Sequence, residues 1–199
     1  CKRHRFLSNE EYAEQAMQLL SFLKSAGVHV SAPVPTKHGS CIAHADDARW
    51  SLFPFIEAVY GAPNKTAWVS FAKELAHLHL ALRDLPKDQK EFFTEKSKES
   101  AAYYNVIPSY TVEDLAQYEG LIDDRREMSE QDTFIRASLP LIEQCIASVA
   151  KEKEAIAAQK TQLIHSDIHP HNILCHEKSE VTILDLDGIR ESERIRDIA

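Results

Sequence analysis

The first half of the chain changes from helical to extended hydrophobic spacing and back again. Apolar side chains recur every three or four residues in two segments, which predicts helices over residues 10–26 and 66–85. Gly27 ends the first segment and Pro86 the second. Between them, residues 41–43 and 50–56 are β-prone runs joined by a polar turn. The pattern therefore predicts a helix, two strands and a second helix.

The second half is polar up to residue 132 and then turns apolar again. A helix is predicted over residues 141–158, after Pro140, and its inward side chains are expected to be Ile142, Cys145, Ile146, Val149 and Ile156. Residues 173–175 and 181–184 are β-prone and flank a polar stretch, which predicts a hairpin. A hairpin returns to its starting point, so residues 172 and 185 are expected to lie at the same end.

Composition narrows the class of protein. The chain has 199 residues, is 44% hydrophobic and 27% charged, and is typical of a globular protein. Its net charge of −8 argues against a nucleic-acid partner, because phosphate contacts need clustered Lys and Arg. Its apolar runs are too short to span a membrane. Four scattered cysteines without a Cys-x2-Cys pair indicate free thiols and a cytoplasmic protein.

The stretch from His165 to Asn172 carries the candidate chemistry. It reads His-Ser-Asp-Ile-His-Pro-His-Asn, and Ile-Leu-Asp-Leu-Asp-Gly follows at residues 183–188. An Asp, an Asn five residues later and a second Asp form the arrangement that phosphoryl transfer requires. Asp167 is the candidate catalytic base, and Asn172 and Asp185 are the candidate Mg²⁺ ligands, because Mg²⁺ prefers hard oxygen ligands.

The same two segments contain two further candidate residues of the site and raise one alternative metal. His165 is expected to fix the loop, and Asp187 is open between a neighbour of the metal and a solvated turn residue. Four histidines suggest zinc as the alternative. Their spacing fits neither a His-x3-His helix nor a Cys/His finger, which disfavours zinc.

This motif resembles that of the aminoglycoside phosphotransferase and choline kinase group of small-molecule kinases, which includes a homoserine kinase branch. Ser166 and the Leu-Asp after Asp185 distinguish it from protein kinases, which have Arg and Phe-Gly there. The ending Arg196-Asp197-Ile198-Ala199 resembles the Asp-Leu-Ala of the family. The resemblance implies an α+β, protein-kinase-like fold of two lobes. Residues 1–57 would form an incomplete N-lobe and residues 58–199 a mainly helical C-lobe.

The resemblance also implies a nucleotide site. Lys2 matches the strand lysine that contacts the phosphates, and Glu14, with Glu11 as second choice, matches its helix partner. The alternative for Lys2 is a solvated terminal charge. Phe55, Ile56 and Glu57 would form the hinge that binds adenine, and the alternative is an ordinary strand.

The function that follows is transfer of phosphate from ATP, with Mg²⁺, to a hydroxyl of a small molecule such as an aminoglycoside, choline or homoserine. A cationic or zwitterionic acceptor is expected, because eight acidic residues gather between positions 113 and 132. The rival is an inactive kinase-like binding or scaffold protein, or a truncated remnant. No glycine-rich phosphate loop is present among the five glycines. The isolated chain is therefore expected to be a poor catalyst and to self-associate through exposed apolar surface.

Overall fold

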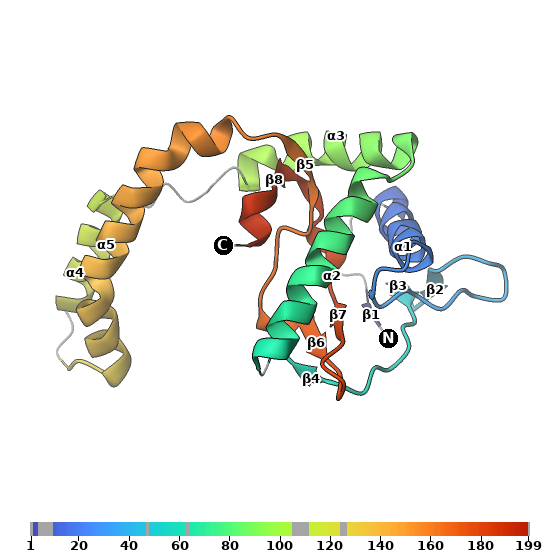
Figure 1. Ribbon diagram of the computed structural model, residues 1–199, viewed down its shortest axis with the longest axis horizontal. Coiled ribbons are helices and arrows are strands. Elements are labelled where there is room, and N and C mark those ends of the chain that lie inside the picture. The colour runs from blue at the N-terminus through green and yellow to red at the C-terminus, as the bar shows by residue number, and fades with distance from the viewer. Residues whose placement is uncertain are drawn as a thin grey trace. The chain divides into compact units, whose positions relative to one another are not determined.

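The computed structural model describes residues 2–3, 10–46, 48–62, 64–104, 112–123 and 127–198. The helices are α1 (Glu10–Ser25), α2 (Lys65–Arg83), α3 (Lys87–Tyr104), α4 (Val112–Asp123) and α5 (Glu130–Ala157) (Figure 1). The strands are β1 (Lys2–Arg3), β2 (Ala43–Ala45), β3 (Ala48–Ser51), β4 (Val59–Tyr60), β5 (Thr161–Ile164), β6 (Ile173–Cys175), β7 (Val181–Ile183) and β8 (Arg190–Glu193). Three short 3₁₀ helices are η1 (Pro170–Asn172), η2 (Leu186–Gly188) and η3 (Arg194–Asp197).

The chain divides into two units. Unit 1 consists of Cys1–Ser97 and Thr161–Ala199, and unit 2 of Lys98–Lys160. No helix in the described part of the chain is both long enough and apolar enough to cross a membrane.

A three-stranded antiparallel sheet with the order β1-β3-β2 begins unit 1. Asp46, at φ 50°, makes the turn between β2 and β3, where Ala45 pairs with Ala48. The strand predicted over residues 50–56 is wrong at its end, because β3 stops at Ser51. Leu52 forms one more bridge with Val34, and Pro54 has no N–H to continue the ladder.

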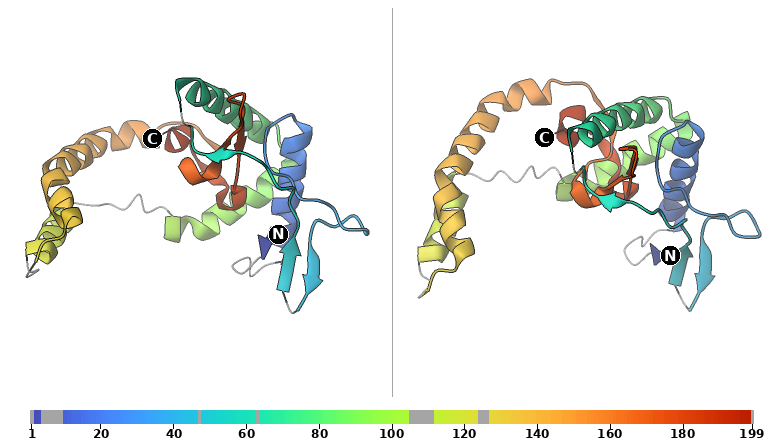
Figure 2. Two further views of the ribbon diagram at one scale, coloured as in Figure 1. Left: turned by 90° about the horizontal axis from the view of Figure 1, so that it is seen from below. Right: turned by 60° about the horizontal axis from the view of Figure 1, so that its bottom comes forward.

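Two further antiparallel sheets, β4-β6-β7 and β5-β8, lie in the same unit. Ile173 pairs with Ile183 across the β6–β7 hairpin, which confirms the hairpin predicted from the sequence. Helix α2 contacts both β5 and β7 and lies along the hairpin in Figures 1 and 2. Val30, in the connection after α1, forms a parallel bridge with Ile183 in β7, so the segment after α1 is joined to the β4-β6-β7 sheet.

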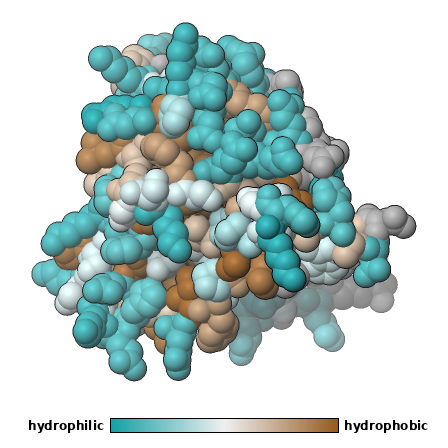
Figure 3. All heavy atoms as spheres, turned by 90° about the vertical axis from the view of Figure 1, so that its right-hand side faces the viewer, coloured by the Kyte–Doolittle hydropathy of each residue, from teal (hydrophilic) through white to brown (hydrophobic). Residues whose placement is uncertain are grey.

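The apolar faces of α1 and α2 form the core of unit 1 with these strands. Leu19, Leu23, Leu78, Leu82 and Ile183 are all buried in one hydrophobic cluster. On the face shown in Figure 3, hydrophilic side chains predominate and hydrophobic ones gather in smaller areas between them. Because both predicted helices contribute an apolar face to one core, helical spacing was a sufficient signal for these elements.

In unit 2, α4 packs against α5. Helix α5 begins at Glu130, so the prediction of a helix that starts after Pro140 is wrong, and Pro140 lies inside α5. The start is set earlier by a cap, in which the Ser129 N–H and hydroxyl both donate to the Asp132 carboxylate, at 3.0 and 2.7 Å.

The predicted inward face of this helix is also corrected. Ile142 and Cys145 are exposed and Ile146 is half-buried. The side chains of Val149 and Ile156 lie outside the described residues. Helical spacing identifies which side chains share a face, but it does not say whether another element covers that face.

Candidate active site

The loop between β5 and β6 brings Asp167 and Asn172 together. The Asn172 side chain is buried, and its amide nitrogen lies 2.9 Å from the Asp167 carbonyl oxygen and 3.2 Å from Asp167 Oδ2. The Asp167 side chain itself is 59% exposed. Asp167 therefore has a fixed backbone and one anchored carboxylate oxygen, while the side chain remains accessible to a reactant.

His165 joins this loop to the end of β7. Its imidazole is fully buried, its Nδ1 accepts from the Asp167 N–H at 3.3 Å, and its Nε2 lies 2.7 Å from the Leu184 carbonyl oxygen. Since Nδ1 accepts, the neutral ring carries its proton on Nε2 and donates it to Leu184. His165 thus connects Asp167 to the residue before Asp185.

The hairpin places the two candidate metal ligands at the same end. The Leu184 N–H donates to the Asn172 carbonyl oxygen at 2.9 Å. Asp185, the next residue, therefore lies at the same end of the hairpin as Asn172. Asp185 has a left-handed backbone, φ 54° and ψ 62°, which turns the chain into η2. An amide oxygen and a carboxylate at one sheet end suit Mg²⁺, which takes few protein ligands and keeps several waters.

Among the described residues, no group of three or more His, Cys, Asp and Glu side chains is placed to hold a metal ion. Two oxygen donors fit a cation that shares its coordination with phosphate and water.

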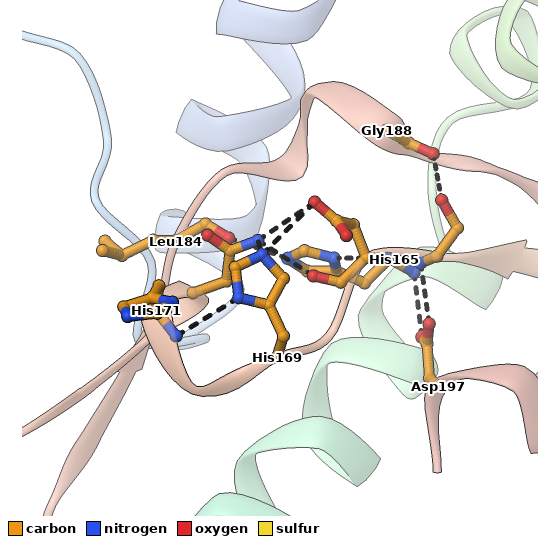
Figure 4. Close-up of polar contacts among 9 residues, drawn as sticks. His165, His169, His171, Leu184, Gly188 and Asp197 are labelled. Carbon is orange, nitrogen blue, oxygen red and sulfur yellow. Dashed lines mark hydrogen bonds and ion pairs between the residues drawn. The ribbon is translucent and has the colours of Figure 1, made fainter. Parts of the chain in front are cut away.

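His169 is a further side chain at this site. Its Nε2 lies 3.0 Å from the Asn172 amide nitrogen and 3.6 Å from Asp167 Oδ2. Its Nδ1 accepts from the His171 N–H at 3.3 Å, and the two imidazole rings are 5.8 Å apart (Figure 4). The imidazole therefore contacts the candidate base and one candidate ligand together.

Asp197, near the end of the described chain, stabilises the backbone of the loop between β5 and β6. Its buried carboxylate accepts from the backbone N–H of His165 at 2.9 Å and of Ser166 at 2.7 Å. His79 Nε2, from α2, lies 2.8 Å from Asp197 Oδ2 and is itself buried. Figure 4 shows the Asp197 carboxylate directed at the loop backbone beside His165.

Ser166 depends on these contacts, because its backbone is left-handed at φ 70°. For residues other than glycine, such a conformation costs of order 1–3 kcal/mol and needs support from its surroundings. The Asp197 carboxylate holds its N–H, and its hydroxyl donates to the Gly188 carbonyl oxygen at 2.5 Å. The turn that presents Asp167 is therefore clamped between η3 and η2.

A charged pair stabilises η3 beside Asp197. Arg196 Nε donates to Glu193 Oε2 at 2.7 Å. Burial opposes the ionised form of Glu193, but the hydrogen bonds from Arg196, the backbone and Ser192, together with the Arg196 charge, hold its pKa below the ordinary value of 4.5. Glu193 is thus ionised at neutral pH and fixes the short helix that carries Asp197.

The structure places the residues of the predicted nucleotide site in β1, in α1 and in the connection between β3 and β4. Lys2 lies in β1 and pairs with Ser51, as a strand lysine should, but its side chain lies outside the described residues. Glu14 is on the exposed side of α1. The pairing of Lys2 with Glu14 or Glu11 stays a prediction.

Phe55, Ile56 and Glu57 lie between β3 and β4 without regular structure, and Phe55 is 93% exposed. This segment connects the first sheet of unit 1 with the β4-β6-β7 sheet. Its adenine-binding role stays a prediction, as does the lobe boundary after residue 57, because both sides of it belong to unit 1.

A small antiparallel sheet with one helix and a largely helical remainder define the class of proteins with a protein-kinase-like fold. The predicted α+β, kinase-like fold is confirmed. The phosphotransferase enzyme family matches residues 1–199, and the chain belongs to this family.

Solved structures agree on the fold. A spectinomycin phosphotransferase in complex with ADP and spectinomycin is 18% identical with a TM-score of 0.68, over 94% of this chain and 56% of that chain. An aminoglycoside phosphotransferase from Alicyclobacillus acidocaldarius is 19% identical with a TM-score of 0.64, over 99% and 58%. An amicoumacin kinase in complex with AMP-PNP, Ca²⁺ and Ami is 13% identical with a TM-score of 0.60, over 96% of this chain and 52% of that chain. The chain thus spans little more than half the length of these proteins. A comparison with curated proteins gives no match.

Sequence reasoning assigned no supporting role to four residues that shape the site: His79, Ser166, His169 and Asp197. Asp197 lies in the ending that resembles the family, but nothing in the sequence pairs it with His79, 118 positions away. The one available signal was the polar character of His79 within an apolar helical stripe, since a buried polar side chain requires a partner.

Proposed function

We propose that the protein transfers the γ-phosphate of ATP to a hydroxyl group of a small molecule. The observation that carries this proposal is the hairpin that returns Asp185 to Asn172, next to Asp167. Family membership supports the same reaction class.

Each residue has a distinct role in this proposal. Asp167 would orient the acceptor hydroxyl and accept its proton, because its carboxylate is accessible and its backbone is fixed by His165. Asn172 and Asp185 would hold Mg²⁺, which when bound neutralises charge on the phosphates. His165 links the loop that carries Asp167 to Leu184, the residue before Asp185. Catalysis would come from positioning and electrostatics rather than from a covalent intermediate.

Nucleotide binding would use Lys2 and Glu14 for the phosphates and Phe55, Ile56 and Glu57 for adenine. What supports this is the strand position of Lys2 and the connection at residues 53–58, in which Phe55 is 93% exposed. The nucleotides named for the similar structures, ADP and AMP-PNP, point to the same cofactor.

The acceptor is proposed to be an amine-bearing alcohol. The net charge of −8 supports a cationic or zwitterionic molecule, as do the substrates named for the similar structures, such as spectinomycin. Among the eight acidic residues at positions 113–132, Asp132 has a structural role, because its carboxylate caps α5.

Two variants of the whole protein test the proposal. Asp185→Ala should abolish Mg²⁺-dependent binding of AMP-PNP, measured by calorimetry, and leave the melting temperature unchanged. Asp167→Asn should keep that binding and lower kcat by on the order of 10²–10⁴, as expected for a positioned base.

The exposed Asp84→Asn serves as the matched control for both variants. Unchanged magnesium-dependent binding in a folded Asp185→Ala protein would contradict the metal assignment. Wild-type protein that binds nucleotide but transfers no phosphate to any alcohol would instead favour the inactive kinase-like binding protein.

A further inference from the structure

Helix α1 contacts the segment that follows the candidate metal ligand Asp185. The Tyr12 hydroxyl donates to the Asp187 carbonyl oxygen at 2.9 Å, across 175 positions of the sequence. Tyr12 lies in the third position of α1 and Asp187 in η2, and these two elements contact each other. One hydrogen bond thus joins the first helix to the loop two residues beyond Asp185.

The Tyr12 ring is held in place by α3. Its centroid lies 6.0 Å from the Phe92 ring and 6.0 Å from the Phe93 ring, the latter at an interplanar angle of 83°. Phe93 is 1% exposed. Edge-to-face packing of this kind fixes the direction of the phenol, so the hydroxyl is presented to Asp187 in a defined position.

The segment it contacts needs such support. Asp185 has a left-handed backbone at φ 54°, and a single 3₁₀ turn follows it. On one side Ser166 donates to the Gly188 carbonyl, and on the other side Tyr12 donates to the Asp187 carbonyl. Two consecutive carbonyls are thus held from different elements, which restricts the rotation of the peptides that follow Asp185.

We propose that Tyr12 is a positioning residue for the metal-binding segment, through which α1 sets the orientation of Asp185. This inference rests on the proposed function, because it takes Asp185 as a magnesium ligand. Tyr12 does not touch the reacting groups, and its effect is expected on metal-dependent nucleotide binding rather than on proton transfer by Asp167.

The test compares Tyr12→Phe with wild type in the whole protein. This variant keeps the ring that packs on Phe92 and Phe93 and removes only the hydroxyl. The affinity for Mg²⁺ in the presence of AMP-PNP should fall by roughly three- to tenfold, the loss of one hydrogen bond. AMP-PNP binding without magnesium should be unchanged.

Hydrogen exchange provides a readout that does not depend on nucleotide. Amides of residues 184–191 should exchange faster in Tyr12→Phe, while those of the 173–183 hairpin should not change. Ser21→Ala is the matched control, since it also removes a hydroxyl from α1, one that donates to the Met17 carbonyl within the same helix. It should alter neither measurement.

The outcomes separate this inference from the proposed function. Equal exchange of residues 184–191 in Tyr12→Phe and wild type would overturn the positioning role. Faster exchange with unchanged magnesium affinity would overturn its link to the metal. Failure of the proposed function would appear in the wild type itself, as nucleotide binding that does not respond to magnesium, and the metal-positioning role would fall with it.

Discussion

The Asp197 carboxylate offers the sharpest test of how the fold positions the candidate base. Its two oxygens accept from the backbone N–H groups of His165 and Ser166, and Oδ2 also contacts His79 Nε2. The Asp197 side chain has no exposed surface and that of His79 is 9% exposed. Asp197→Asn keeps the shape of the side chain but replaces one acceptor oxygen with a donor.

The expected magnitude follows from these contacts. A hydrogen bond to a charged group contributes about 1.5–3 kcal/mol, and a buried donor left without an acceptor costs about 1–3 kcal/mol. Asp197→Asn removes the charge and one backbone bond, so a loss of about 2–4 kcal/mol in the free energy of unfolding is expected. Asp197→Ala removes every acceptor and should cost about 3–5 kcal/mol, as when one partner of a buried pair is deleted.

The kcat of Asp197→Asn should fall by more than the loss of stability alone would predict. Without the carboxylate, the left-handed Ser166 loses its N–H partner and the loop that carries Asp167 can shift. A displacement of about 1 Å at a catalytic group lowers the rate by on the order of 10². The decrease should appear in kcat rather than in the affinity for nucleotide.

Urea unfolding and steady-state kinetics of the whole protein measure the two effects separately. Asp84→Asn is the control, because Asp84 also pairs with a basic side chain but is 67% exposed. A double-mutant cycle with His79→Ala isolates the contribution of the histidine. An Asp197→Asn protein with wild-type stability and wild-type kcat would refute the role of Asp197, and equal losses in Asp84→Asn would show that the effect is not specific.

Three further changes test the packing and electrostatics around the site. Leu78→Ala, in the fully buried core, should lower the free energy of unfolding by about 2–5 kcal/mol in urea, and the half-exposed Leu80→Ala by much less. The pKa of Glu193 is lowered in the folded state. Its contribution to the free energy of unfolding is therefore complete above pH 4.5 and is lost as the pH falls through the pKa of the folded state. The melting-temperature difference between wild type and Glu193→Gln should therefore be largest near neutral pH and vanish in acid, and a constant difference would contradict this. Gly188→Ala would place a Cβ 3.3 Å from Ser166 Oγ, so its destabilisation should be smaller in a Ser166→Ala background, and additive losses would show that the two positions do not interact.

The sequence alone determined the elements that depend on local spacing. Helices α1 and α2 and the β6–β7 hairpin follow from hydrophobic periodicity and turn residues, because their apolar faces share one core. It also predicted Asp167, Asn172 and Asp185 as candidate site residues, since the predicted hairpin brings Asp185 back to the end where Asn172 lies. Local spacing failed at α5, because a cap at Ser129 sets the start of the helix and Pro140 lies inside it.

Only the tertiary structure decided which distant residues support the site. His79 meets Asp197 across 118 positions and Tyr12 meets Asp187 across 175. Such contacts are made by backbone carbonyls, buried carboxylates and hydroxyls, whose partners depend on how the sheets and helices pack and not on any local pattern. The sequence could therefore name the groups that would carry the chemistry, while the fold determined which other residues hold them in place.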